Sequence, residues 1–73
     1  MDVDIATSQP QQKALYRVME AKVILSLSRS AIYEEIRSGR LRSVTRGRTR
    51  LIPASAITEY VQLLEREADS EVI

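Results

Sequence analysis

Arginine is the residue type in this sequence that is best placed to do chemistry. The chain has 73 residues and a formal net charge of only +1, yet residues 29–52 sum to +5 and residues 53–73 to −4. Six arginines and no acidic residue lie between Ile36 and Ile52: Arg37, Arg40, Arg42, Arg46, Arg48 and Arg50. Such a block attracts a polyanion, because each cation placed on a phosphate releases condensed counterions. The simpler alternative is a solvated basic face without a partner.

Groups for catalysis or metal binding are scarce. The sequence contains no Cys and no His, which excludes thiolate zinc sites, cysteine nucleophiles and the commonest general base. A chain of this length has room for one small domain. We therefore expect no enzyme activity, no metal and no cofactor or small-molecule ligand. No apolar stretch approaches the roughly 18 residues of a membrane span, and no signal-peptide layout is visible, so we expect a soluble cytoplasmic protein.

Two short helices separated by a tight turn are expected ahead of the basic block. Residues 19–25 have apolar side chains at the i, i+3, i+4 spacing of one helix stripe. These side chains are Ala21, Ile24 and Leu25. Ser28 can cap a second helix that runs to Ser38, and Gly39 suits the left-handed position that commonly follows a helix. This arrangement predicts a helix-turn-helix.

The second helix should bury Ile32 and Ile36, which lie at i, i+4. Its opposite side then carries the side chains that could enter a DNA major groove, which is wide enough for one helix. These side chains are Ser30, Tyr33, Glu34 and Arg37. Arg29 lies beside the cap, where helix amides also bind phosphate.

Each of these side chains has an alternative role. Arg37 could bind a guanine edge or a phosphate, and Tyr33 and Ser30 could bind phosphates or a thymine methyl group. Tyr33 could instead pack on the following hairpin. Glu34 repels phosphate, so it either accepts a hydrogen bond from cytosine or pairs with Arg37 or Arg29. We favour the ion pair.

The next segment predicts a hairpin wing. Two β-prone runs flank Gly47 and Arg48, and glycine at the first central position suits a two-residue type II′ turn. That register pairs Val44 with Leu51. The wing candidates for the adjacent minor groove are Arg46, Gly47, Arg48 and Arg50. Weaker candidates for contact with the DNA backbone are Ser28, Arg40 and Arg42, of which the two arginines could instead complement the helix dipole.

A third helix is expected over residues 54–67. Its apolar stripe comprises Ile57, Tyr60, Val61 and Leu64, at i, i+3, i+4, i+7 spacing. Tyr60 and Tyr16 are predicted core residues. The domain would occupy residues 15–67, between a flexible tail over residues 1–14 and an acidic tail over residues 68–73. The predicted fold is mainly α with a β-hairpin wing, a winged helix-turn-helix.

The stretch from Tyr16 to Leu64 resembles the excisionase-type DNA-binding domain, a branch of the winged-helix group that includes MerR-type and AlpA-like phage regulators. The matching residues are Val18, Glu20, Ala21, Leu25, Ser28, Arg29, Ser30, Ile32, Tyr33, Ile36, Gly39, Leu41, Gly47, Arg50, Leu51, Ile52 and Pro53. Three positions depart from the family pattern. Lys22 replaces a small residue, Ser26 replaces glycine, and Glu35 replaces an apolar residue.

The resemblance implies that Ser28–Arg37 is the recognition helix and Val44–Ile52 the wing. Excisionases are recombination directionality factors of site-specific recombination. Several copies bind attachment-site repeats in double-stranded DNA, bend it and recruit an integrase. The resemblance thus implies a temperate phage or integrative element, neighbouring copies and an integrase as partners, and a nucleoid-associated location in a bacterial host. Acidic residues from Glu59 onward could meet the next copy or the integrase.

Two other functions stay open. A small winged-helix transcriptional regulator would have the same fold. A protein-interaction adaptor, from a different class, would use the arginines to dock an acidic partner.

Overall fold

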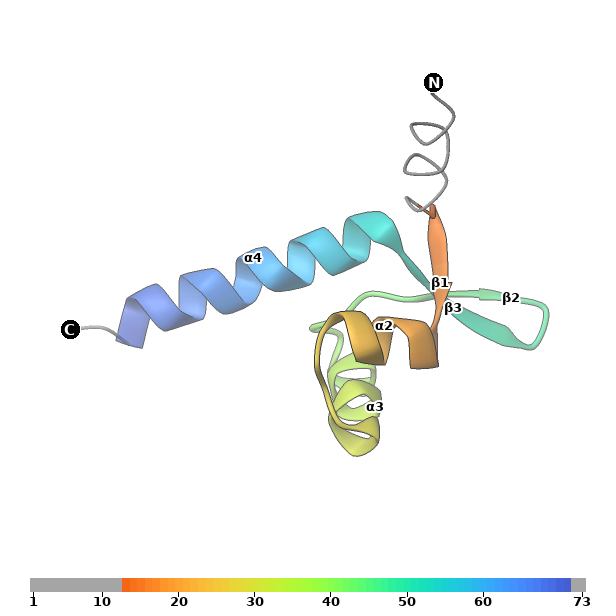
Figure 1. The fold of residues 1–73 in the computed structure, drawn as a ribbon, viewed down its shortest axis with the longest axis horizontal. Coiled ribbons are helices and arrows are strands. Elements are labelled where there is room, and N and C mark those ends of the chain that lie inside the picture. The colour runs from red at the N-terminus through yellow and green to blue at the C-terminus, as the bar shows by residue number, and fades with distance from the viewer. Residues whose placement is uncertain (1–12, 72–73) are drawn as a thin grey trace, which may run out of the picture.

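The computed structural model describes residues 13–71 and arranges them as a small helical unit with a three-stranded sheet (Figure 1). The elements are β1 (Leu15–Arg17), α2 (Val18–Ile24), α3 (Arg29–Ser38), β2 (Val44–Arg46), β3 (Thr49–Pro53) and α4 (Ala54–Glu71). The sequence-predicted winged helix-turn-helix is confirmed. Most of the predicted N-terminal tail lies outside the described residues. Its last residue is tied to the fold, because the Ala54 N–H donates a 2.8 Å hydrogen bond to the Ala14 carbonyl.

One small core joins all the helices to the sheet. Its fully or nearly fully buried side chains are Val18, Ala21, Ile32, Leu41, Ile52, Ala56 and Tyr60. Tyr60 is 2% exposed, as predicted, and Tyr16 is partly buried against the same cluster.

Helix α2 begins one residue earlier than the sequence suggested and buries a different stripe. Val18 and Ala21 are buried, whereas Ile24 is 49% exposed. The expected apolar stripe of Ala21, Ile24 and Leu25 is therefore not buried as a whole, because Ile24 lies roughly a quarter turn from the centre of the buried side. Ser26 then adopts a left-handed conformation with φ 57°. Its N–H bonds to the Val23 carbonyl at 3.1 Å and closes the tight turn.

Helix α3 begins and ends where its local signals predicted. The Ser28 hydroxyl accepts a 3.1 Å hydrogen bond from the Ala31 N–H, which satisfies one of the free amides of the first turn. Gly39 follows the helix with φ 87°, a conformation that costs glycine little. Ile32 is fully buried and Ile36 is partly buried against the core, which fixes the face that α3 turns outward.

The hairpin has the predicted register, with Val44 opposite Leu51 and Arg46 opposite Thr49. Gly47 has φ 62°, consistent with the first central position of a type II′ turn. Strand β1 adds to the other edge of β3, so the antiparallel sheet has the order β1-β3-β2. One face of the sheet presents Ile52 to the core, and no helix within residues 13–71 covers the other face.

Helix α4 is longer than predicted and turns a different side towards the core. It runs to Glu71, four residues beyond the expected end at Glu67. Its buried side comprises Ala56 and Tyr60, with Ile57 and Leu63 partly buried. Val61 and Leu64 are 39% and 38% exposed, so their assignment to the buried stripe was wrong. None of the helices in residues 13–71 is long and apolar enough to cross a membrane.

Candidate nucleic-acid interface

The outward side of α3 carries the side chains that the sequence proposed for base reading. Because Ile32 points into the core, the helical repeat turns the opposite side to solvent. The exposed residues there are Ser30, Tyr33, Glu34 and Arg37. Arg29 is also exposed, but it lies in the first turn of α3 on the side nearer to Ile32. Ser28 lies at the head of this surface, where its hydroxyl is already used by the Ala31 N–H.

Arg37 and Glu34 form an ion pair on this surface, one turn apart on α3. Both side chains stay largely open to solvent, with 70% of Arg37 and 67% of Glu34 exposed. The sequence-based preference for an ion pair at Glu34 is therefore confirmed. A pair this exposed adds little stability, but the carboxylate limits the directions in which the guanidinium can point.

Helix α3 and the hairpin enclose an open groove of about 400 Å³. It is lined by Tyr33, Ile36 and Arg37 from α3 and by Arg50 from β3. Arg50 also donates a 2.7 Å hydrogen bond to the Ser43 hydroxyl, which orients it. The groove thus brings together two arginines, an aromatic ring and an apolar wall. Such a set can hold a phosphate and a base edge side by side.

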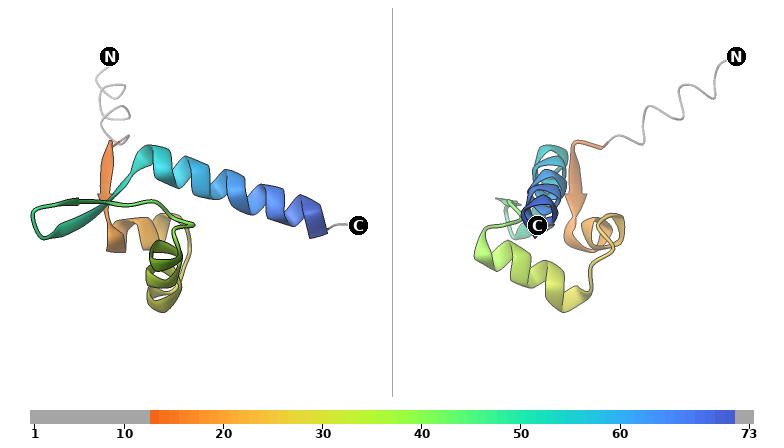
Figure 2. Two further views of the ribbon diagram at one scale, coloured as in Figure 1. Left: turned by 180° about the vertical axis from the view of Figure 1, so that it is seen from behind. Right: turned by 90° about the vertical axis from the view of Figure 1, so that its left-hand side faces the viewer.

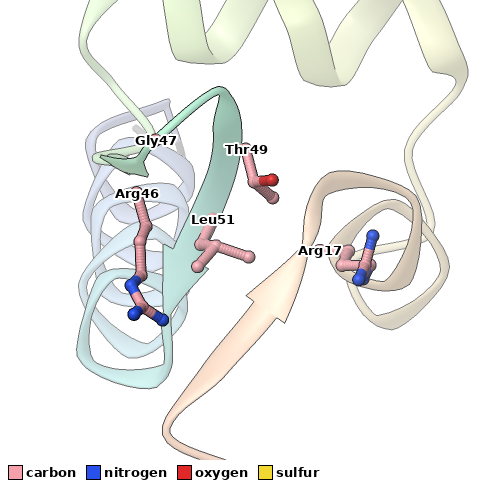
Figure 3. A pocket seen from close by; sticks show the side chains of 5 residues that line it. All are labelled: Arg17, Arg46, Gly47, Thr49 and Leu51. Atoms are coloured by element: carbon pink, nitrogen blue, oxygen red, sulfur yellow. The ribbon is translucent and has the colours of Figure 1, made fainter.

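The three predicted wing arginines do not share one surface. Arg46 and Arg50 lie on opposite faces of the sheet, because side chains alternate along paired strands and Arg46 pairs with Thr49 while Arg50 pairs with Thr45. Figure 3 shows Arg46 and Arg17 on either side of Leu51 and Thr49. Together with Gly47 these residues line a second open cavity of about 600 Å³. Arg48 is exposed in the turn between the two faces.

Arg40 is engaged within the chain. Its guanidinium donates to both carboxylate oxygens of Glu67 on α4, and its Nε donates to Glu35 at 2.6 Å. The hydrogen bonds from Glu67 and Glu35 raise the pKa of Arg40, and the same contact lowers the pKa of Glu67. Glu35 thus has a partner at a position where the family pattern has an apolar side chain.

Arg42 makes a similar connection to the first turns of α4. It donates to the two carboxylate oxygens of Glu59, both at 3.2 Å, and to the Ser55 hydroxyl at 3.0 Å. A DNA-backbone role for Arg40 and Arg42 stays a prediction, and it would require these contacts to open. Sequence reasoning missed this network. Glu59 and Glu67, two turns apart on one side of the last helix, were the available signal.

Five further arginines form no ion pair with the described carboxylates. Within residues 13–71, no carboxylate forms a salt bridge with Arg17, Arg29, Arg46, Arg48 or Arg50. Three of these, Arg29, Arg48 and Arg50, lie on α3, at the wing tip and in the α3–hairpin groove. Only part of the formal positive charge of residues 29–52 therefore lies beside α3.

Comparison with known families gives one match. A family described as a helix-turn-helix domain, which includes excisionase-like DNA-binding domains, matches residues 15–62, from β1 into α4. No curated protein and no solved structure matches the chain significantly.

Proposed function

The chain belongs to this helix-turn-helix domain family, which implies that it binds DNA, and from that premise we propose that it is an excisionase-type protein. In this proposal it binds repeated attachment sites in a bacterial cell, bends the DNA and directs an integrase towards excision.

The observation that carries the proposal is the pairing of α3 with the hairpin across one groove. Arg37 and Arg50 line that groove from the two elements. With α3 in the major groove, its outward side chains reach base edges. Arg48 at the hairpin tip then lies where it can follow the backbone into the adjacent minor groove, whose negative potential attracts arginine when the groove is narrow.

The small size of this surface favours an architectural role. Helix α3 is 10 residues long, so one copy touches few base pairs. Useful affinity then depends on neighbouring copies held on repeated sites, where each bound copy raises the effective concentration of the next. A wing and a recognition helix that grip adjacent grooves also favour bent DNA, because a bend increases the protein surface in contact.

One observation favours the alternative, a small winged-helix transcriptional regulator of the AlpA or MerR kind. Helix α4 extends to Glu71 and exposes Val61 and Leu64, as a helix that pairs with another copy would. A symmetric pair would read an inverted repeat, whereas an excisionase array reads direct repeats.

A duplex-selection experiment tests the two functions. The full chain is used to select bound duplexes from a random pool, and the enriched fragments are then circularly permuted in a mobility-shift titration at near-physiological salt. Stepwise complexes on direct repeats with position-dependent mobility support the excisionase. One unbent complex on an inverted repeat supports the regulator. The absence of any bound duplex would contradict both and favour the adaptor with an acidic protein partner.

A further inference from the structure

Helix α4 carries an exposed stripe of mixed character on the side away from the core. We call this the α4 stripe: Val61, Leu64, Glu65, Ala68 and Asp69, all of them exposed. Two other acids of α4 are used internally, because Glu59 binds Arg42 and Glu67 binds Arg40. Glu65 and Asp69 have no basic partner among residues 13–71. The stripe is therefore apolar with an unpaired acidic margin.

The uncovered face of the sheet has the complementary character. We call this the outer sheet face: Leu15, Arg17, Val44, Arg46 and Leu51, which lie on one side of the three strands by register. Leu15 and Val44 are 41% and 39% exposed. Arg17 and Arg46 flank the half-buried Leu51 (Figure 3) and form no salt bridge with the described carboxylates. Among the described residues, this face is therefore apolar with a basic margin that no carboxylate neutralises.

The two surfaces cannot meet within one chain. Helix α4 points away from the hairpin, and the two lie at opposite ends of the molecule in both directions of view (Figure 1 and Figure 2, left). A contact between two different surfaces of identical chains is heterologous, and one that does not close into a ring produces an open array. Neither surface includes a side chain of α3, so the array leaves the outward side of α3 free for DNA. Arg46 is the one wing candidate that lies on the outer sheet face.

We propose that neighbouring copies on DNA bind head to tail, with the α4 stripe of one copy packed on the outer sheet face of the next. This inference rests on the proposed function, because the DNA repeats bring the copies together. Helix α2 also exposes apolar residues, Met19, Val23 and Ile24, but it complements the acidic α4 stripe less well than the outer sheet face does. The only basic side chain within α2 is the partly buried Lys22, against two arginines on the sheet.

The contact is tested by measuring the binding of charge-reversed chains to DNA with one or two copies of a selected site. Wild-type protein should fill the second site with a cooperativity factor of about 5- to 150-fold, the usual range for coupled sites. Arg17→Glu should reduce this factor to about one-fold, the uncoupled value, because it places like charges across the contact. Arg66→Glu makes the same change in net charge on α4 and should keep the wild-type factor. Arg46 is left unchanged, since it is also a wing candidate.

A mixture of two variants tests the contact more specifically. Glu65→Lys/Asp69→Lys should also lose cooperativity alone. An equal mixture with Arg17→Glu should recover it, because the unaltered α4 stripe of one chain meets the unaltered sheet face of the other. Cooperativity that survives either variant, or that the mixture does not recover, would overturn the head-to-tail contact.

A DNA-free measurement separates this inference from the proposed function. Amide NMR signals of the free chain should shift with protein concentration at both surfaces together. Shifts confined to α4 would mean symmetric pairing and would overturn the inference. Failure to bind one-site DNA would contradict the proposed function, whereas one-site binding without cooperativity between two sites would contradict the head-to-tail contact alone.

Discussion

The Arg40 guanidinium donates two hydrogen bonds, of 2.5 and 2.9 Å, to the carboxylate of Glu67, which lies 27 residues later in the sequence. This contact ties the segment that follows α3 to the protruding part of α4. Arg42 and Glu59 repeat the arrangement two turns earlier on α4. Helix α4 therefore holds the connection between α3 and the hairpin at two points.

Glu67→Gln tests whether Arg40 positions the interface or contacts DNA itself. If Arg40 acts through α4, the substitution lowers the free energy of unfolding and weakens DNA binding without changing the salt slope. If Arg40 instead binds a phosphate, loss of the competing carboxylate strengthens binding. Binding titrations at several salt concentrations distinguish the two results, because the DNA affinity falls in the first case and rises in the second. Glu65→Gln is the matched control, with both variants measured on a duplex that holds one site, where no neighbouring copy can contact Glu65.

The stability of the fold should decline at both ends of the pH scale. Hydrogen bonds from Arg40 lower the pKa of Glu67, and those from Lys13 and the Arg17 N–H lower the pKa of Glu20, both from a usual 4.5. Their contribution to stability is therefore present above pH 4.5 and is lost as the pH falls through the folded-state pKa values.

At the alkaline end, burial and the nearby Glu35 charge raise the pKa of Tyr60 above 10.0. The stabilising contribution of its neutral hydroxyl is present below pH 10.0 and is lost as the pH rises through the folded-state pKa. Chemical unfolding across a pH series measures the loss of stability at both ends. Glu67→Gln should make the free energy of unfolding depend less on pH in the acid range and leave its alkaline decline in place. An unchanged acid dependence would argue against the Arg40–Glu67 contact.

Two substitutions by aspartate test which sides of α2 and α3 are buried. Ile32 has no exposed surface, whereas Ile24 is 49% exposed. Ile32→Asp should abolish the cooperative thermal transition, since it buries an unpaired charge. Ile24→Asp should stay within about 0.5 kcal/mol of wild type, the usual range for surface changes. Circular dichroism melts compare the two, and a cooperative melt for Ile32→Asp would contradict the buried face described for α3.

Arg48→Ala probes the wing tip. Arg48 is exposed in the turn and has no acidic partner among the described residues. The substitution should weaken binding to all duplexes alike and lower the salt slope by about 1, as expected for one lost phosphate contact. Arg66→Ala, on α4, is the control with the same loss of charge. Equal effects of the two variants would mean that the wing tip makes no specific contact.

The sequence predicted the features that depend on neighbouring residues. The Ser28 cap, the glycine after α3, the Val44–Leu51 register and the Glu34–Arg37 pair all join residues within a few positions of one another or across one tight turn. The outward side of α3 followed from these signals, because the cap and the buried Ile32 fix the phase of a short helix.

Features that depend on distant packing were not predicted. The stripe of α4 was misassigned because Val61 and Leu64 fit a helical repeat as well as the buried residues do, and only the position of the sheet selects Tyr60 and Leu63. The Arg40–Glu67 contact joins two elements whose approach no local pattern indicates. The separation of Arg46 from Arg50 follows from strand alternation. Only the packed structure shows that Arg50 lines a groove with α3, whereas Arg46 lies on the other face of the sheet.

The central claim is that α3 reads DNA through its outward side, and Arg37→Ala tests it most directly. Binding of wild-type and variant chains is measured by fluorescence anisotropy on the selected site and on single-base-pair variants of it, at one fixed salt concentration. We expect a loss of about 1–3 kcal/mol in binding free energy on the selected site, with discrimination relaxed at one base pair. Unchanged affinity and unchanged discrimination at every position would contradict DNA reading by α3.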